Sequence, residues 1–222
     1  MSRLNEDRRS LVLLLSVLLF VMLHPFIESS RIGGLILLLL VYLTLATAAL
    51  DLHEKGTFGW IALFLVLPSM LATLVGVIHP ARTLVIVNFA SMALIFALVS
   101  VGLFSYLGQP GSVTSGRIYA SASLYLILAL FWFALYNVCE EVHPGSFVHM
   151  AATGPVRVLR SEFTYFSLIT LTTVGYGDIV PVSPVTRTLA ALEGATGVLY
   201  IAITVARLVA AYQQTDDRKK QR

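Results

Sequence analysis

The residues best suited to chemistry form one short string, Thr172–Asp178, in which glycine occupies the alternate positions 175 and 177. Glycine adopts backbone conformations that other residues resist, so alternating glycines allow successive carbonyl groups to face the same way. A row of carbonyl oxygens can replace the water around a cation. In a soluble protein, the same string would more often be a glycine-rich turn after a short helix. The surrounding sequence decides between these interpretations.

The composition indicates a membrane protein. The chain of 222 residues is 57% hydrophobic and only 12% charged, about half the charged fraction of an ordinary soluble domain. About 20 apolar residues span a bilayer as a helix. Runs of near or beyond that length contain no Asp, Glu, Lys or Arg, and a further long run follows the string: Ser10–Ile27, Ile32–Leu50, Gly56–Ala81, Thr83–Gly116 and Ile118–Cys139.

The turn-rich segment Gly108–Gly116 predicts a boundary between two domains, residues 1–112 and 113–222. The first domain is expected to hold four transmembrane helices, at approximately Ser10–Ile27, Ile32–Leu50, Phe58–Ile78 and Thr83–Tyr106. The second is expected to hold an outer helix, an external stretch, a short helix, the string and an inner helix, at about Arg117–Cys139, Glu140–Arg160, Ser161–Thr172, Thr173–Gly177 and Pro184–Tyr212. The predicted fold is an all-α membrane protein with six transmembrane helices and a re-entrant loop.

The short helix is the element that most restricts the function. Ser161 and Glu162 are typical of a helix N-terminus, and the remaining Phe163–Thr172 is too short to cross a bilayer. Irregular backbone at membrane depth is tolerated only where protein or water covers it. One chain offers a single strip of carbonyls from Thr173–Gly177, so several copies must surround an axis. We therefore expect a homotetramer.

The string and its setting resemble the selectivity filter of tetrameric potassium channels, over about Arg117–Tyr212. The resemblance implies a passive potassium channel that is not an enzyme and has no cofactor besides the potassium ions in its filter. It implies that K⁺ is coordinated by the Thr173 hydroxyl and by the carbonyls of Thr173, Val174, Gly175 and Tyr176. Gly177 would complete the outer mouth.

The same resemblance suggests which residues support the filter. Thr172 and Asp178 flank it, and Tyr165 and Phe166 fall where members of the family place aromatic residues around the filter. Some members carry a glutamate at the position of Ile169 that pairs with the outer-mouth aspartate. Asp178 is therefore expected to find another partner, for which Tyr165 is the candidate.

Four residues of the inner helix are candidates for a role in gating. Glu193 is a carboxylate in an apolar span, where charge is costly; it could bond Thr or Tyr hydroxyls of the short helix, with either a structural or a regulatory role. Gly194 and Gly197 could be points of bending or of close helix approach. Arg207 could extend to the lipid headgroups or pair between subunits at the gate.

The first four helices predict weak or absent voltage dependence. A voltage sensor needs several basic residues along its fourth helix, and none occurs between Thr83 and Gly116. Loop and tail arginines and lysines are more numerous on the side that holds both termini. The termini are therefore expected in the cytoplasm, and the protein in the plasma (inner) membrane as a multi-pass protein.

Four histidines fall on the predicted outer side: His24, His79, His143 and His149. Histidine changes charge near physiological pH, so they could sense external acidification, or they could simply cap helix ends at the interface.

Several other functions stay open. A non-selective cation channel is one, although Tyr176 argues against it; a subunit of a potassium-uptake transporter and a membrane sensor with a vestigial pore are others. The expected partners are K⁺, membrane lipids and further copies of the chain. The sequence shows no pattern of a nucleic-acid-binding protein and no catalytic triad.

Overall fold

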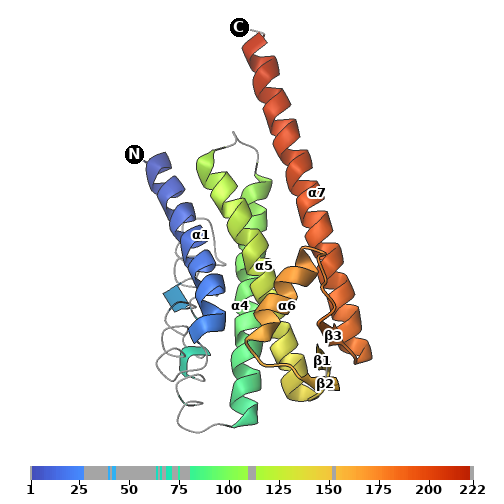
Figure 1. The fold of residues 1–222 in the computed structure, drawn as a ribbon. Coiled ribbons are helices and arrows are strands. Elements are labelled where there is room, and N and C mark those ends of the chain that lie inside the picture. The colour runs from blue at the N-terminus through green and yellow to red at the C-terminus, as the bar shows by residue number, and fades with distance from the viewer. Residues whose placement is uncertain are drawn as a thin grey trace.

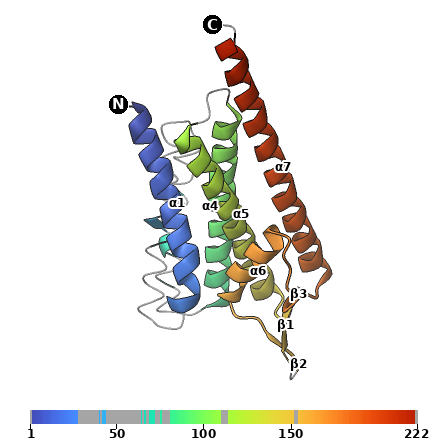
Figure 2. The same cartoon turned by 45° about the horizontal axis from the view of Figure 1, so that its top comes forward.

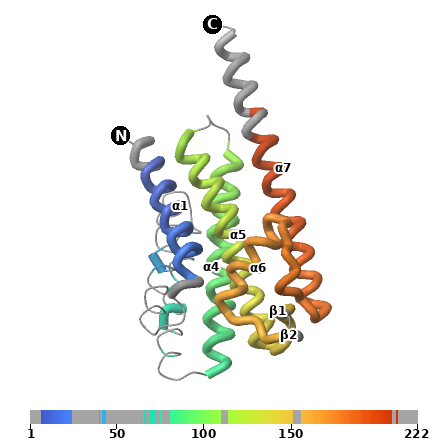
Figure 3. Tube along the Cα trace, viewed as in Figure 1, coloured from blue at the N-terminus to red at the C-terminus, as the bar shows by residue number. Residues whose placement is uncertain are grey.

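The computed structural model describes residues 2–27, 81–109, 114–151 and 154–220, together with positions 40, 42, 43, 64, 66, 69–71 and 75. In Figure 3 the remaining positions are grey, as are both ends of the chain. The expected second and third transmembrane helices, over 32–50 and 58–78, and also His79, lie outside the described residues apart from those single positions.

The described part of the chain is mostly helical. Its helices are α1 (Ser2–Ile27), α4 (Arg82–Gly108), α5 (Ser115–Val142), α6 (Glu162–Leu171) and α7 (Pro184–Lys220). Three of the described segments are long and apolar enough to cross a membrane: Arg82–Gly108, Ser115–Val142 and Pro184–Arg207. The predicted outer, short and inner helices are therefore present, and the inner helix continues eight residues beyond its expected end at Tyr212, to Lys220.

The long helices lie side by side and run in alternating directions (Figure 1). α1 and α5 begin, and α4 and α7 end, at the same end of the molecule. The short helix α6 lies near the opposite end, between α5 and α7, and Figure 2 shows the same arrangement after rotation. A chain that enters through α6 and leaves through β3 therefore returns to the end from which it came, as a re-entrant loop must.

The packed core joins α1, α4 and α5. Leu13 and Phe20 of α1, Phe96 of α4, and Leu124 and Ile127 of α5 are almost completely buried. These side chains are apolar, so their burial stabilises the contact between the three helices. By contrast, the outer faces of α4 and α7 carry many exposed apolar side chains.

A small antiparallel sheet corrects the expectation of an all-α fold. Its strands are β1 (Phe147–Ala151), β2 (Gly154–Arg157) and β3 (Ile179–Pro181), in the order β2-β1-β3. His149 of β1 lies opposite Val156 of β2 and Ile179 of β3. The strands are too short for an alternating pattern to be recognised in the sequence. Because β3 follows the string almost directly, the sheet anchors its outer end.

Candidate ion-binding loop

The helix that leads into the string, α6, begins differently from the expectation. Ser161 occupies the N-cap position, but it has helical backbone angles and its side chain makes no capping bond. Instead, the Glu162 carboxylate accepts a hydrogen bond from the Leu159 N–H at 2.7 Å. The acid in the first turn therefore both closes the preceding turn and favours the positive end of the helix.

At its other end, α6 binds the backbone of the string. The Thr173 N–H donates to the Thr170 carbonyl at 3.0 Å. The N–H groups of Val174 and Gly175 both donate to the Ile169 carbonyl, at 2.8 and 3.1 Å. In a trans peptide group, the carbonyl points opposite to the N–H. The carbonyls of Thr173 and Val174 therefore point away from the end of α6.

The backbone of the string alternates in conformation, as the glycine spacing indicates. Thr173, Gly175 and Gly177 have positive φ angles of 61°, 50° and 80°. Alternating right- and left-handed backbone angles bring successive N–H groups to one side of a chain, and the carbonyls then face the other side. A positive φ at a β-branched residue is strained, and such strain is concentrated at functional sites. Thr173 is the non-glycine residue with a positive φ in the described part of the chain.

The string is open to its surroundings within one chain. The Val174 side chain is 52% exposed and that of Tyr176 is 73% exposed. Thr172, which caps the end of α6, donates its hydroxyl to the Leu168 carbonyl at 2.7 Å. The inner end of the string is thus attached to α6, while the side chains of Val174 and Tyr176 are exposed.

The outer end of the string has the partner that the sequence suggested. The Tyr165 hydroxyl donates to Oδ2 of Asp178 at 2.8 Å, and the Tyr165 ring stacks on Tyr176, with centroids 6.4 Å apart and planes 7° apart. The backbone carbonyl of Asp178 accepts from the Met150 N–H of β1 at 2.6 Å. Desolvation, together with the bond to Asp178, raises the pKa of Tyr165 to about 12. Tyr165 therefore remains a donor at physiological pH.

Phe166 lies elsewhere than the resemblance implied. It is buried behind α6. Its ring packs edge to face against Tyr136 of α5 and Phe147 of β1, with ring centroids 5.2 and 5.4 Å apart. Phe163 completes this cluster at 4.8 Å from Phe147. Phe166 therefore holds the back of α6 against the outer helix and the sheet, and it contacts the string only through that helix.

Glu193 links the three helices around the string. Its side chain is fully buried, and its carboxylate accepts hydrogen bonds from the hydroxyls of Tyr136 on α5 and Ser167 on α6, the latter at 2.5 Å. Ser167 also lies 2.7 Å from the Ala129 carbonyl. A hydroxyl partner on the short helix was predicted, but as Thr or Tyr. The sequence analysis did not identify the actual pair, Ser167 and Tyr136. Ser167, a small polar residue inside the apolar helix α6, was the feature that could have indicated it.

The two glycines of α7 differ in their surroundings. A Cβ on Gly197 would overlap the Leu171 carbonyl oxygen and lie 2.8 Å from its carbon. A Cβ on Gly194 would lie 3.7 Å from the Thr170 carbonyl oxygen, an ordinary contact. Gly197 is therefore a point of close approach between α7 and the end of α6, whereas Gly194 is not.

Arg207 and the histidines are widely separated. Arg207 lies in the second half of α7 with its guanidinium over the Phe104 ring, 5.3 Å from the centroid. His24 is buried between Phe20 and Phe133 and lies 3.2 Å from the Thr164 hydroxyl. That burial does not suit His24 to sensing external protons. His143, exposed after α5, and His149, half-buried in β1, lie on the outer side of the fold.

Acidic residues at the end of α5 organise the outer stretch, and the sequence did not suggest their roles. Glu140 accepts from the N–H groups of Gly145 and Phe147, at 2.8 and 3.3 Å. Glu141 pairs with Arg160, with a nearest distance of 2.5 Å. These contacts, between the outer helix and the segment that precedes α6, place the string at a defined height. Two adjacent acids followed by Arg157 and Arg160 were the available signal.

Two apolar helices therefore flank a ten-residue re-entrant helix and a string with alternating backbone angles. This arrangement defines a pore-loop membrane protein. Residues 120–214 match the family model described as an ion channel.

Known proteins show the same likeness over this region. The chain is 31% identical over 93 residues to the inward rectifier potassium channel Kirbac3.1 of Paramagnetospirillum magnetotacticum, covering 40% of this chain and 27% of that protein. It is 34% identical over 87 residues to two-pore potassium channel 4 of Arabidopsis thaliana, covering 38% and 29%. It is 43% identical over 60 residues to the potassium voltage-gated channel protein shk-1 of Caenorhabditis elegans, covering 24% and 11%. No solved structure matches significantly.

Residues 120–214 thus match an ion channel family model, and parts of the chain are similar to potassium channels. It spans less than a third of the length of each of these relatives. The residues that match the family model contain α6, the string and most of α5 and α7.

Proposed function

We propose that the protein is a potassium-selective channel, in which Thr173–Gly177 is the filter. The observation that carries the proposal is the alternation of positive φ angles at Thr173, Gly175 and Gly177, together with N–H groups directed at α6. This backbone directs carbonyls away from the protein, where they could replace the hydration shell of K⁺. The potassium channel relatives support K⁺ as the ion.

The proposed assembly is a homotetramer. One chain contributes one strip of carbonyls, and a closed ring around an ion needs several. The exposed side chains of Val174 and Tyr176, and the apolar span of α7, of which only 11% is buried, are surfaces that neighbouring copies would cover. The proposed division into a four-helix domain over 1–112 and a pore domain over 113–222 assigns the conducting path to α5, α6, α7 and the filter.

The proposed gating is weakly dependent on voltage or independent of it. Along α4 the sequence has one basic residue, Arg82. Its guanidinium donates to the carbonyls of Glu141, at 2.6 Å from Nε, and Val142, at 3.0 Å from Nη2. A charge held at a helix end has little field to cross. We further propose that the protein lies in the plasma membrane of a bacterium, with both termini in the cytoplasm.

Reversal potentials in liposomes with opposed K⁺ and Na⁺ gradients test the selectivity. A reversal potential near the potassium equilibrium potential would support the proposed filter. A reversal potential midway between the equilibrium potentials of K⁺ and Na⁺ would indicate the non-selective alternative. The sharpest variant is Gly177→Ala, because Gly177 has a φ of 80° that alanine resists.

Gly145→Ala is the matched control. Gly145 has a φ of 84°, and neither glycine has a heavy atom within 4 Å of an added Cβ. Both substitutions therefore carry the same backbone penalty, about 1–2 kcal/mol. Only Gly177→Ala should lose K⁺ selectivity. Equal effects on selectivity would remove the role assigned to the string.

A further inference from the structure

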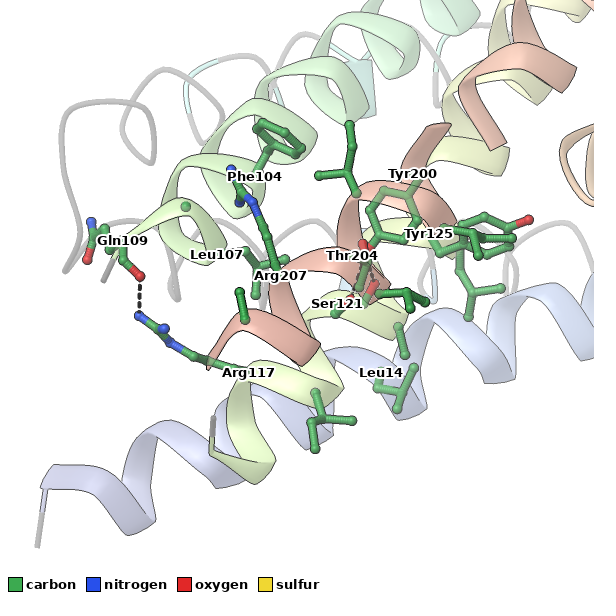
Figure 4. Close-up of a pocket in the computed structure, with 18 of the residues that line it drawn as sticks. Leu14, Phe104, Leu107, Gln109, Arg117, Ser121, Tyr125, Tyr200, Thr204 and Arg207 are labelled. Carbon is green, nitrogen blue, oxygen red and sulfur yellow. Dashed lines mark hydrogen bonds between the residues drawn. The ribbon is translucent and has the colours of Figure 1, made fainter. Parts of the chain in front are cut away.

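A cavity of about 870 Å³ opens at the end of the molecule opposite the string. Its walls come from α1, α4, α5 and α7, four helices that are far apart in the sequence (Figure 4). A volume of this size encloses a drug-sized molecule. Most of the wall is apolar, and it includes Leu14, Leu18, Leu107, Leu126, Ile201 and Ile203.

The hydroxyl groups of the wall bond one another. The Tyr200 hydroxyl lies 2.6 Å from the Ser121 carbonyl and 2.8 Å from the Ser121 hydroxyl. Because these polar groups are satisfied, they offer little to a polar ligand. The interior of the cavity therefore favours hydrocarbon.

Two arginines line the cavity (Figure 4). The Arg117 guanidinium donates to the Gln109 carbonyl at 3.0 Å and lies 5.6 Å from the Tyr106 ring centroid. Arg207 lies over Phe104. Within the described residues, neither guanidinium pairs with a carboxylate. Asp7 is nearby in α1, but its carboxylate accepts from the Gly116 N–H at 2.7 Å.

The two arginines also share one level of the membrane. An added Cβ on Gly108, at the end of α4, would lie 3.6 Å from Nη1 of Arg207, and the Arg117 guanidinium donates to the carbonyl of the next residue, Gln109. Both charges therefore lie at the level where the apolar span of α4 ends, at the boundary between hydrocarbon and water. Lipid phosphates lie at that boundary, and the apolar wall continues from it toward the hydrocarbon.

We propose that this cavity binds one anionic phospholipid, with its phosphate between Arg117 and Arg207 and an acyl chain along the apolar wall. The charge of the mouth matches the headgroup, and the apolar interior matches the chain. A soluble anion would leave the wall unused. Since α1 and α4 supply part of the wall, the lipid would join the first four helices to the inner helix.

Native mass spectrometry of the purified full chain in detergent tests the proposal. The probes are phosphatidylglycerol and phosphatidylcholine with identical acyl chains, added in equal amounts. The wild type should retain phosphatidylglycerol preferentially. Arg117→Gln or Arg207→Gln should each reduce that preference about fivefold, and the double variant on the order of thirtyfold. Arg187→Gln, an exposed arginine near the other end of α7, should leave it unchanged.

A second variant tests the apolar part without changing charge. Ala122 is exposed and lines the cavity, so Ala122→Phe should reduce retention of both lipids severalfold. Equal retention of phosphatidylglycerol by the wild type, the arginine variants and Ala122→Phe would overturn the proposal. A second result would also overturn the proposal: the wild type retains no lipid, and cross-linking places a second copy of the chain in the cavity. The readout is binding, so it does not depend on whether the filter conducts.

Discussion

Replacing Gly197 by alanine isolates the contact between the inner helix and the end of α6. The added Cβ would overlap the Leu171 carbonyl oxygen and lie 2.8 Å from the carbonyl carbon and 3.3 Å from the Leu171 Cα. Non-bonded heavy atoms prefer about 3.5–4.0 Å, and the overlap is greatest at the oxygen, so the two helices would have to separate by more than about 1 Å. The neighbour is backbone, which cannot rotate out of the way as a side chain can.

The expected size of the effect follows from two opposing terms. Alanine in a helix interior is favoured over glycine by about 1 kcal/mol. Overpacking a close contact costs about 1–3 kcal/mol, occasionally more, so Gly197→Ala should destabilise by about 0–2 kcal/mol. Gly194→Ala lacks the clash and should gain up to about 1 kcal/mol. The difference between the two variants removes the propensity term and leaves packing alone, about 1–3 kcal/mol.

Thermal unfolding in detergent, followed by tryptophan fluorescence, measures that difference. For a chain of this size, 1 kcal/mol corresponds to about 2–4 °C in Tm. Gly197→Ala should therefore unfold about 2–12 °C below Gly194→Ala. Refutation would be an equal rise in Tm for both variants, because it would mean that α7 and α6 are not in close contact at Gly197. The glycine would then be better explained as a point of bending.

Three further predictions concern the residues around the string and the first four helices. Glu193→Ala should destabilise by about 1–3 kcal/mol, because it leaves the buried Tyr136 hydroxyl without its acceptor, and Glu193→Gln should lose less in the same thermal assay. Tyr165→Phe removes the hydrogen bond to Asp178 and should speed the decay of K⁺ current during sustained opening. In the wild type, the rate of this decay should not change through ionisation of Tyr165 below pH 10, because the raised pKa of Tyr165 keeps its hydroxyl protonated. Recordings across ±100 mV should show no steep, sigmoidal opening; such opening would contradict the proposal that Arg82, the one basic residue of α4, does not act as a voltage sensor.

What the sequence could predict was local. The glycine spacing predicted the alternating backbone of the string, and the absence of a glutamate at Ile169 left Tyr165 as the partner of Asp178, because both features depend on residues within one loop. The identity of the hydroxyls around Glu193 could not be predicted, since it depends on the rotation of three helices about their axes. The sheet was missed because β3 has only three residues and ends in proline.

The end of α6 connects these features into one structural argument. The last four carbonyls of a helix have no partner within it, and here each has one from outside the regular helix: Leu168 from Thr172, Ile169 from Val174 and Gly175, Thr170 from Thr173, and Leu171 from the Tyr125 hydroxyl at 3.2 Å. The Leu171 carbonyl also packs against Gly197, where the absence of a Cβ allows the close approach. A displacement of α7 at this height would therefore press on the backbone that holds the string, without passing through any side chain. If α7 bends to open a path for ions, the bend should lie beyond Gly197, toward Arg207, where α7 no longer touches α6.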